Sequence, residues 1–361
     1  MIGRADRATI LTTSFLLLAG LIALYSASAP FSLRHFGSDL HMLVRQLAAA
    51  GAGCVALFVF ARLDYHLLLQ LNEVILFGAT ALSCVTLLPL PICVGGCWLS
   101  FGAFDLQPTE FVKLALILYL SASIARRGGR MARFGEGVAP YLLILGVLGA
   151  ITMSQPDLGM LLVYAGITLT MLFLGGASLR HLAAIGLASL PLVYVAVRIA
   201  PYRFARLLSF LNPTAYSTSS GYQVLQSLVA VGSGGLLGRG LGASRAKLFY
   251  LPQAHNDFIL SIVGEELGLL GTVAALSLLG LLVWRAFVIA EAARDAEGRL
   301  IAYGIGVSIG LQTLLNAGVI LGILPVTGLT LPFFSNGGTS LLLTLAMVGV
   351  LLNVSRQGGT R

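Results

Sequence analysis

Charged residues are scarce in this sequence. Asp, Glu, Lys and Arg account for 10% of its 361 residues, whereas 57% are hydrophobic. A soluble domain carries about 25% charged residues, so this chain cannot cover a water-exposed surface with polar groups. The composition excludes an ordinary cytosolic enzyme, a disordered chain and a secreted disulfide-rich domain. It indicates a protein that is solvated by lipid.

Cysteines and the usual cofactor motifs are scarce as well. Cys93 and Cys97 have no neighbouring histidine and, like the other two cysteines, lie in or beside apolar stretches. We expect small buried hydrophobic residues rather than zinc ligands or a disulfide. The glycine-rich segment 232–242 lacks the G-x-G-x-x-G spacing of a dinucleotide fold and the Gly-Lys-Ser/Thr ending of a P-loop. We therefore expect no nucleotide cofactor.

Long apolar stretches, by contrast, recur from about residue 8 to about residue 355. At roughly 20 residues per span, they predict an all-α polytopic membrane protein with about ten transmembrane helices, in one integral membrane domain over residues 1–361. Ala27-Ser28-Ala29 mimics a signal-peptidase site, but the spans that follow indicate a retained first helix. The expected spans are 8–29, 43–61, 72–93, 108–125, 138–154, 157–175, 180–199, 259–288, 300–322 and 338–354.

The distribution of basic residues predicts the orientation in the membrane. Of 22 basic residues, 20 are Arg and two are Lys, Lys113 and Lys247. The cluster Arg126-Arg127-Gly128-Gly129-Arg130 and the other short-loop arginines place both termini in the cytoplasm by the positive-inside rule. Because the arginines are scattered through short loops and do not form a run with interleaved aromatic residues, we expect contact with membrane lipid and no nucleic-acid partner.

Residues 201–258 form the one long loop, and it is expected on the extracytoplasmic side between spans seven and eight. Residues 222–231 read as a short interfacial helix within it. The loop carries basic residues that orientation does not require, which suggests an anionic ligand. These residues are Arg203, Arg206, Arg239, Arg245 and Lys247.

Two spans begin with Gln-Pro followed closely by an acidic residue. Glu110 suits the first turn of a helix that starts at Pro108, but this does not explain Lys113, which the spacing of three places beside Glu110. The pair could serve a substrate or simply hold the helix. Asp157 follows Gln155-Pro156 in the same pattern, and helix capping is its alternative role.

Two further segments bring polar groups to membrane depth. Asp257 follows His255 where the long loop enters span eight, either as a helix cap or as a functional acid. Glu265 and Glu266 lie deeper, and at least one must face the protein interior. Segment 324–340 contains two prolines and three glycines between its apolar residues. It predicts irregular backbone that lines a cavity, with a plain outer hairpin as the alternative.

Together these segments resemble the SEDS family (shape, elongation, division and sporulation) of FtsW/RodA type. The resemblance covers nearly the whole chain, and residues 247–252 and 328–332 are closer to the division members than to the elongation members. Three positions depart from the family pattern, namely Cys97 (usually basic), Asn256 (often Thr) and Asn336 (usually Tyr). The motifs are Tyr25-Ser26-Ala27-Ser28, Gln107 to Lys113, Gln155 to Gly159, Tyr222-Gln223, Lys247 to Phe258, Gly264 to Gly268 and Leu329 to Ser340.

The resemblance implies a peptidoglycan glycosyltransferase of the bacterial inner membrane. Its members polymerise lipid II and release undecaprenyl pyrophosphate, in division or elongation. Asp257 is then the essential acid on the extracytoplasmic side, where a carboxylate can act as general base. A divalent cation, Mg or Mn, is a candidate cofactor, with Asp257 as a candidate ligand. The expected substrate-binding residues are Glu110, Lys113, Asp157, Arg203, Arg206, Lys247, His255, Ser335 and Gly337.

The expected partners are a class B penicillin-binding protein, which is a transpeptidase, and the proteins of the divisome or elongasome. Two other functions stay open at this point. A lipid II flippase would also need buried charges and interrupted spans, and a non-catalytic scaffold could recruit the transpeptidase. A polymerase needs its charged groups on one side of the membrane, whereas a flippase needs them along a path through it.

Overall fold

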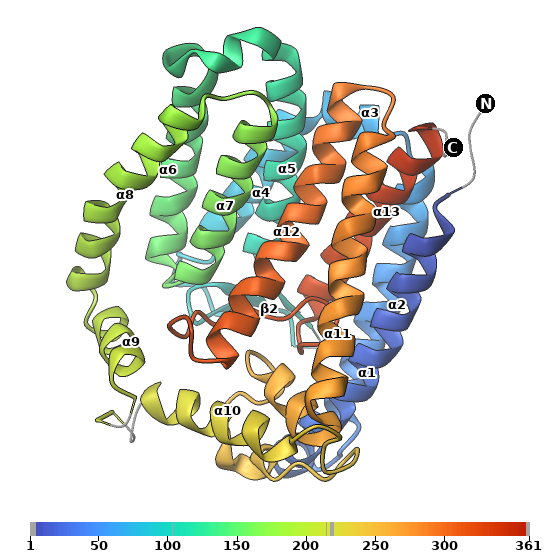
Figure 1. Ribbon diagram of the computed structural model, residues 1–361, viewed down its shortest axis with the longest axis vertical. Coiled ribbons are helices and arrows are strands. Elements are labelled where there is room, and N and C mark those ends of the chain that lie inside the picture. The colour runs from blue at the N-terminus through green and yellow to red at the C-terminus, as the bar shows by residue number, and fades with distance from the viewer. Residues whose placement is uncertain (1–4, 103, 214, 217–219, 359–361) are drawn as a thin grey trace.

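Long helices run side by side through most of the computed structural model, which describes residues 5–102, 104–213, 215–216 and 220–358 (Figure 1). Shorter helical turns are η1 (Gly128–Ala132), η2 (Phe134–Val138) and η3 (Ala246–Tyr250). The α-helices are α1 (Arg7–Phe36), α2 (His41–Arg62), α3 (Tyr65–Gln70), α4 (Asn72–Val85), α5 (Pro108–Arg127), α6 (Ala139–Ser154), α7 (Leu158–Leu174), α8 (Leu179–Ile199), α9 (Pro201–Leu211), α10 (Ser220–Gly234), α11 (Ile259–Glu291), α12 (Ala296–Ile320) and α13 (Gly338–Gly358).

The helices overlap the expected spans, and the predicted helical class is confirmed. Among the described residues, eight helices are long and apolar enough to cross a membrane. Two shorter apolar helices, α4 and α7, occupy the positions of the third and sixth expected spans. The long segment 201–258 also contains helical structure, including α10 over the predicted short helix.

The third span differs most from its prediction. Helix α4 ends at Val85, so the expectation of a helix to residue 93 is wrong. Pro89 and Pro91 follow, and proline cannot continue a helix because it lacks the amide hydrogen. The chain instead forms a small antiparallel sheet in the order β1-β2-β3, an exception to the all-α expectation. Its strands are β1 (Cys93–Val94), β2 (Trp98–Ser100) and β3 (Asp105–Leu106).

Helix α11 is interrupted near its start. Gly268 has φ 67° and ψ −163°, which breaks the helical path. The segment after α10 fills the break, because the amide of Leu269 donates to Gly235 O (2.9 Å) and the amide of Arg239 donates to Glu265 O (3.0 Å). The glutamates before the break, at 265 and 266, are both buried, so the expectation that at least one faces the interior is confirmed.

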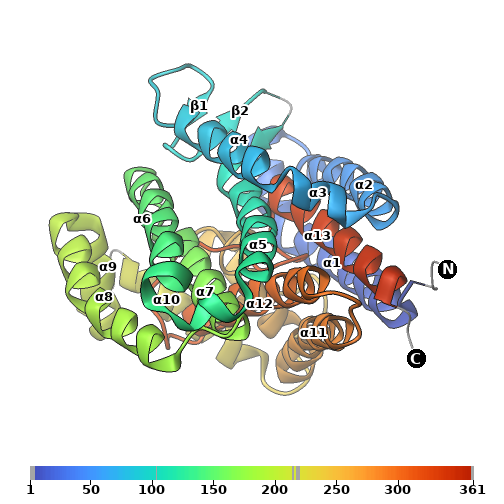
Figure 2. The same cartoon turned by 90° about the horizontal axis from the view of Figure 1, so that it is seen from above.

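The core of the bundle lies around α5, α12 and α13. Helix α2 packs along α13, α11 packs on α12, and α12 contacts both α5 and α7. Most of the side chains in α5, α12 and α13 are buried, whereas the apolar stretch of α8 has no buried side chain among those that the structure describes. Seen from above, α8 and α9 stand at the periphery (Figure 2). Glu110 and Lys113 in the buried part of α5 therefore lie inside protein, not in lipid.

The two ends of the bundle differ. The chain termini lie at one end (Figure 1), where Asp6 pairs with Arg285 (2.5 Å) and its amide donates to Ser355 Oγ (3.2 Å). Helices α9 and α10 lie at the opposite end (Figure 1). Both termini at one end fit an even number of membrane crossings.

Candidate active site

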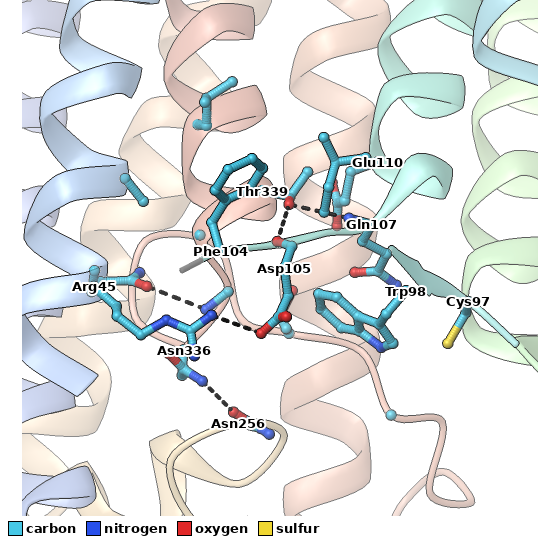
Figure 3. Close-up of a pocket in the computed structure, with 18 of the residues that line it drawn as sticks. Arg45, Cys97, Trp98, Phe104, Asp105, Gln107, Glu110, Asn256, Asn336 and Thr339 are labelled. Atoms are coloured by element: carbon cyan, nitrogen blue, oxygen red, sulfur yellow. Dashed lines mark hydrogen bonds and ion pairs between the residues drawn. The ribbon is translucent and has the colours of Figure 1, made fainter. Parts of the chain in front are cut away.

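A cavity of about 1000 Å³ opens among α2, the strands, the start of α5 and the segment before α13. Its walls come from parts of the chain far apart in sequence, as the labelled side chains in Figure 3 show. The structure brings five of the predicted site residues to this cavity. They are Glu110, Asp157, Arg206, Asp257 and Gly337.

Glu110 lies on the first turn of α5 and forms an ion pair with Lys113. The distance from Lys113 Nζ to Glu110 Oε2 is 2.6 Å, so the contact predicted from their spacing is confirmed. Lys113 also donates to Gln312 Oε1 on α12 (2.8 Å). Lys113 is completely buried and does not line the cavity, whereas Glu110 does. Lys113 thus orients the carboxylate of Glu110 from the side that faces away from the cavity.

Asp157 and Asp257 both stand where a helix begins, but their side chains are used differently. Asp157 caps α7 by accepting a hydrogen bond from the Met160 amide (3.0 Å), as its alternative role predicted, and it also lines the cavity. Helix α11 is preceded by Phe258, and it has no side-chain cap. The carboxylate of Asp257 is therefore not used for capping.

Burial sets the protonation of Asp257, which lies outside the helices. Loss of water around the carboxyl raises its pKa to about 6, the guanidinium of Arg206 opposes this rise, and the carboxylate of Asp157 adds to it. A carboxyl group with a pKa near the working pH can take up and release a proton readily. Burial and, to a smaller extent, the neighbouring His35 lower the pKa of His255 in the same loop to about 4, so that His255 is neutral at pH 7.

The small sheet forms one wall of the cavity. Arg45 on α2 pairs with the carboxylate of Asp105 (2.7 Å) at the start of β3. Thr339 Oγ1 at the start of α13 donates to Asp105 O (3.0 Å) and accepts from the amide of Gln107 (3.2 Å). Figure 3 shows these contacts with Trp98 of β2 beside them. The strand segment is thereby held against α2 and α13.

The irregular segment between α12 and α13 forms another wall. Thr327 to Thr330 and Asn336 to Thr339 line the cavity, so the predicted cavity-lining backbone is confirmed. Ser335 lies just behind: its hydroxyl donates to Asn256 O (2.6 Å) and accepts from the amide of Leu331 (2.8 Å). Its hydroxyl therefore connects two parts of the chain instead of pointing into the cavity.

Three other predicted residues lie outside the cavity lining. Lys247 is buried in an ion pair with Glu266 (2.7 Å) and donates to Ser26 Oγ (2.9 Å). Arg203 donates to Met153 O (2.8 Å). His255 stacks against Phe31 of α1, with ring centroids 4.6 Å apart. In the structure Lys247 and Arg203 thus make contacts within the protein, and their substrate contacts stay predictions.

Some cavity residues were not among those predicted. Arg45, Trp98, Asp105, Asn256 and Asn336 line it, and an asparagine on α12, Asn316, bonds to the backbone of Asp257. A polar residue within an apolar span is a signal that the sequence does contain. The sequence could not show which of these polar residues converge.

The divalent cation predicted from the sequence is not tested by the structure. Within the part of the chain that the structure describes, no three side chains of His, Cys, Asp or Glu converge to hold a metal ion. The described side chains therefore do not form a metal site by themselves. A role for Mg or Mn stays a prediction.

Comparison with known families assigns the chain. A family model for cell cycle proteins, covering FtsW, RodA and SpoVE, matches residues 7–359. The chain belongs to this family. The resemblance found in the sequence motifs is thereby confirmed over almost the full length.

Curated relatives of the FtsW/RodA/SpoVE family match end to end. The probable peptidoglycan glycosyltransferase FtsW of Geobacter metallireducens is 40% identical, and the match covers 99% of this chain and 97% of the relative. Stage V sporulation protein E of Bacillus subtilis is 42% identical, with 97% of each chain covered. The chain is thus about 40% identical, over nearly its full length, to relatives that include a named peptidoglycan glycosyltransferase.

Solved structures of the family match as well. One comes from work on the structural coordination of polymerization and crosslinking by a peptidoglycan synthase complex, with TM-score 0.82, 30% identity and 98% of both chains covered. The rod shape determining protein RodA of Thermus thermophilus matches with TM-score 0.72 and 30% identity, covering 98% of this chain and 97% of RodA. Both establish the helical membrane-protein fold of this chain.

Proposed function

We propose that this chain is a peptidoglycan glycosyltransferase that polymerises lipid II into glycan strands and releases undecaprenyl pyrophosphate. Relatives named as peptidoglycan glycosyltransferases, about 40% identical over nearly the full length, support it. The single observation that carries the mechanism is the place of Asp257. Its carboxyl lines the large cavity, does not cap a helix and has a raised pKa.

The proposed reaction joins a sugar hydroxyl to the anomeric carbon of another sugar. The 4-hydroxyl oxygen attacks that carbon, and Asp257 accepts the hydroxyl proton as general base. The bond between the anomeric carbon and the lipid pyrophosphate breaks, and its electron pair leaves with the pyrophosphate. Arg206 on α9 lines the same cavity and can stabilise this anion. Cleavage of the bond between the sugar and the lipid pyrophosphate drives the reaction, and the pyrophosphate leaves intact, so no nucleotide is consumed.

The other cavity groups can hold the sugars. Lys113 orients the carboxylate of Glu110, which can accept hydrogen bonds from sugar hydroxyls. The ring of Trp98 offers an apolar face beside the strand wall (Figure 3). A volume of about 1000 Å³ is large for a small-molecule pocket. It suits sugar rings and a pyrophosphate better than one small metabolite.

The proposal includes a place in the cell. We infer a multi-pass protein of the bacterial inner membrane with ten spans, both termini in the cytoplasm and the cavity facing the extracytoplasmic side. The arginine distribution and the positions of the termini and the cavity loops support this orientation. In this proposal the long extracytoplasmic loop keeps the limits that the sequence predicts, 201–258. The likeness to a member of a peptidoglycan synthase complex supports a transpeptidase partner, and the relatives named FtsW favour a role in division.

The test is polymerisation of fluorescent lipid II in detergent by the purified full-length protein, together with its transpeptidase partner. We expect Asp257→Asn to lower kcat by at least about 100-fold, since loss of a general base costs roughly 10²–10⁴-fold. Asp39→Asn is the matched control, because Asp39 lies outside the cavity lining and accepts a hydrogen bond from Tyr25. It should retain the wild-type rate.

Wild-type polymerisation by Asp257→Asn would overturn the proposed role of Asp257. A transport assay covers the other class of function. If the protein in sealed vesicles moved lipid II across the membrane and never made polymer, the chain would be a transporter instead. Vesicles that form polymer only from lipid II on the cavity side support the glycosyltransferase.

A further inference from the structure

Three consecutive backbone carbonyls around Asp257 are held from outside their own loop. The amide of Asn336 donates to His255 O (2.9 Å), and the hydroxyl of Ser335 donates to Asn256 O (2.6 Å). The side-chain amide of Asn316 donates to Asp257 O (2.8 Å). The donors lie 59 to 81 positions later in the chain, on α12 or in the segment before α13. The path of the loop that carries Asp257 is therefore set by the C-terminal third of the protein.

Asn316 stands out because its single amide nitrogen holds two separate segments. Besides Asp257 O, Nδ2 donates to Leu329 O, also at 2.8 Å. The side chain is 1% exposed on α12, and its oxygen Oδ1 has no hydrogen-bond partner in the described chain. Because an amide group is planar, its two N–H bonds have a fixed angle. The two carbonyls are thus fixed relative to each other.

This geometry reaches the carboxylate of Asp257. Leu329 follows Gly328, whose φ is 79°, and a Cβ placed on Gly328 would lie 3.8 Å from Asp257 Oδ2. The carboxylate therefore stands against the segment that Asn316 also holds. By fixing Asp257 O and Leu329 O together, Asn316 sets how the carboxylate faces the opposite wall of the cavity.

We propose that Asn316 is a positioning residue, which fixes Asp257 for catalysis by clamping the backbone of residues 257 and 329. This rests on the proposed function of Asp257 as general base. A displacement of about 1 Å at a reacting group can cost about 100-fold in rate. Without the clamp, the backbone carbonyls of residues 257 and 329 lose their donor, so the loop has reason to move.

The chain contains a matched control at the other end of the bundle. Asn353 on α13 is 5% exposed, and its Nδ2 donates to Ala61 O (3.1 Å) and Leu63 O (2.9 Å). It is also a buried asparagine that holds two backbone carbonyls, but it lies far from the cavity. A merely structural role predicts similar effects for both asparagines, whereas a positioning role predicts a kinetic effect for Asn316 only.

The experiment compares Asn316→Leu with Asn353→Leu, since leucine keeps the branched shape and removes the donor. Both variants should lower the midpoint of thermal unfolding. We expect Asn316→Leu to lower kcat for fluorescent lipid II by about 100-fold with KM changed by less than about threefold. Asn353→Leu should keep kcat within about threefold of wild type. Equal kcat losses in both variants, or a wild-type kcat in Asn316→Leu, would overturn the proposal.

The pH profile gives a readout that lost stability alone does not move. The charged groups that act on Asp257 are Arg206 from α9 and Asp157 from the turn before α7, while burial keeps its pKa high. A loosened loop admits water and lowers that pKa. The acid limb of the pH–rate profile, where the rate falls as Asp257 takes up a proton, should therefore move to lower pH in Asn316→Leu. It should stay in place in Asn353→Leu.

Two further variants keep the test decisive. Asn316→Ser retains one hydroxyl donor and is a smaller disturbance if the leucine variant does not fold. Its kcat should lie between those of the leucine variant and the wild type, and a wild-type kcat and acid limb would overturn the proposal. Asp257→Asn is measured in parallel. An active Asp257→Asn contradicts the proposed function, whereas an inactive Asp257→Asn with matching effects at Asn316 and Asn353 contradicts only the positioning role.

Discussion

The two lysines of the chain are both buried, and each forms an ion pair with a glutamate, but their surroundings differ. Lys113 pairs with Glu110 at 2.6 Å, and Lys247 pairs with Glu266 at 2.7 Å. Glu110 borders the large cavity, whereas neither Lys247 nor Glu266 does. Lys113 has Gln312 as its further partner, and the Nε2 of that glutamine has no hydrogen-bond partner in the described chain.

The second pair, Lys247 with Glu266, makes its further contacts with other protein groups. Glu266 accepts hydrogen bonds from Lys247, from the hydroxyl of Ser26 and from the amide of Ser244. It joins the start of α11 to α1 and to the end of the long loop. A buried ion pair is therefore not by itself evidence of a substrate site, because the same chemistry can join helices. An adjoining cavity is what distinguishes the first pair.

The largest expected effect is a difference in kcat between variants of the two glutamates, Glu110 and Glu266. Glu110→Gln leaves Lys113 charged and unpaired and alters a cavity wall, so we expect polymerisation to fall by about 100-fold or more. Glu266→Gln should destabilise the protein by about 3–5 kcal/mol, as for other broken buried pairs. The folded fraction of this variant should keep kcat within about threefold of wild type. Thermal unfolding and lipid II polymerisation measure both effects, and equal kcat losses would remove the distinction.

The second prediction concerns how the polymerisation rate depends on pH, and its expected effect is intermediate in size. Since the pKa of Asp257 is raised to about 6 and the base must be deprotonated, the rate should rise with pH through about 6 and be lost below it. Asp157→Asn removes a negative charge and should move this acid limb to lower pH. Arg206→Gln removes a positive charge and should move it to higher pH. Lys247→Met should leave the limb unchanged, and a shift in that variant would show that the second pair also acts on the cavity.

The smallest expected effect on stability concerns a third, more exposed ion pair. The side chains of Arg45 and Asp105 are 35% and 40% exposed, and exposed pairs contribute about 0.2–1 kcal/mol. Arg45→Gln should thus change the midpoint of unfolding little, while the loosened strand wall raises KM for lipid II by a few-fold. A denaturation curve and a substrate titration check this. If Arg45→Gln lowered the free energy of unfolding by several kcal/mol, the Arg45–Asp105 pair would contribute as much to stability as the buried pairs.

Much of the helical framework and several site residues could be predicted from the sequence. The expected spans match helices because apolar stretches of spanning length must satisfy their backbone internally. The contact of Glu110 with Lys113 followed from helical spacing alone. Segment 324–340 was recognised as irregular because prolines and glycines interrupt its apolar residues.

Other features were out of reach because they depend on distant parts of the chain. The break in α11 at Gly268 could not be predicted, since a single glycine is tolerated in many helices. It forms where segment 235–240 supplies alternative backbone partners. The wall made by β2 and β3 likewise depends on contacts with Arg45 and Thr339.

The sequence by itself determined a lipid-solvated helical protein, the approximate limits of its helices and a short set of charged residues that lipid would not accept. The tertiary structure alone decided which of these charges meet. It placed Asp257, Asp157, Glu110 and Arg206 at one cavity and closed Lys247 into a separate ion pair. The physical reason is that hydropathy and spacing act over a few turns of one helix. The position of Asp257, by contrast, depends on hydrogen bonds from residues 59 or more positions away.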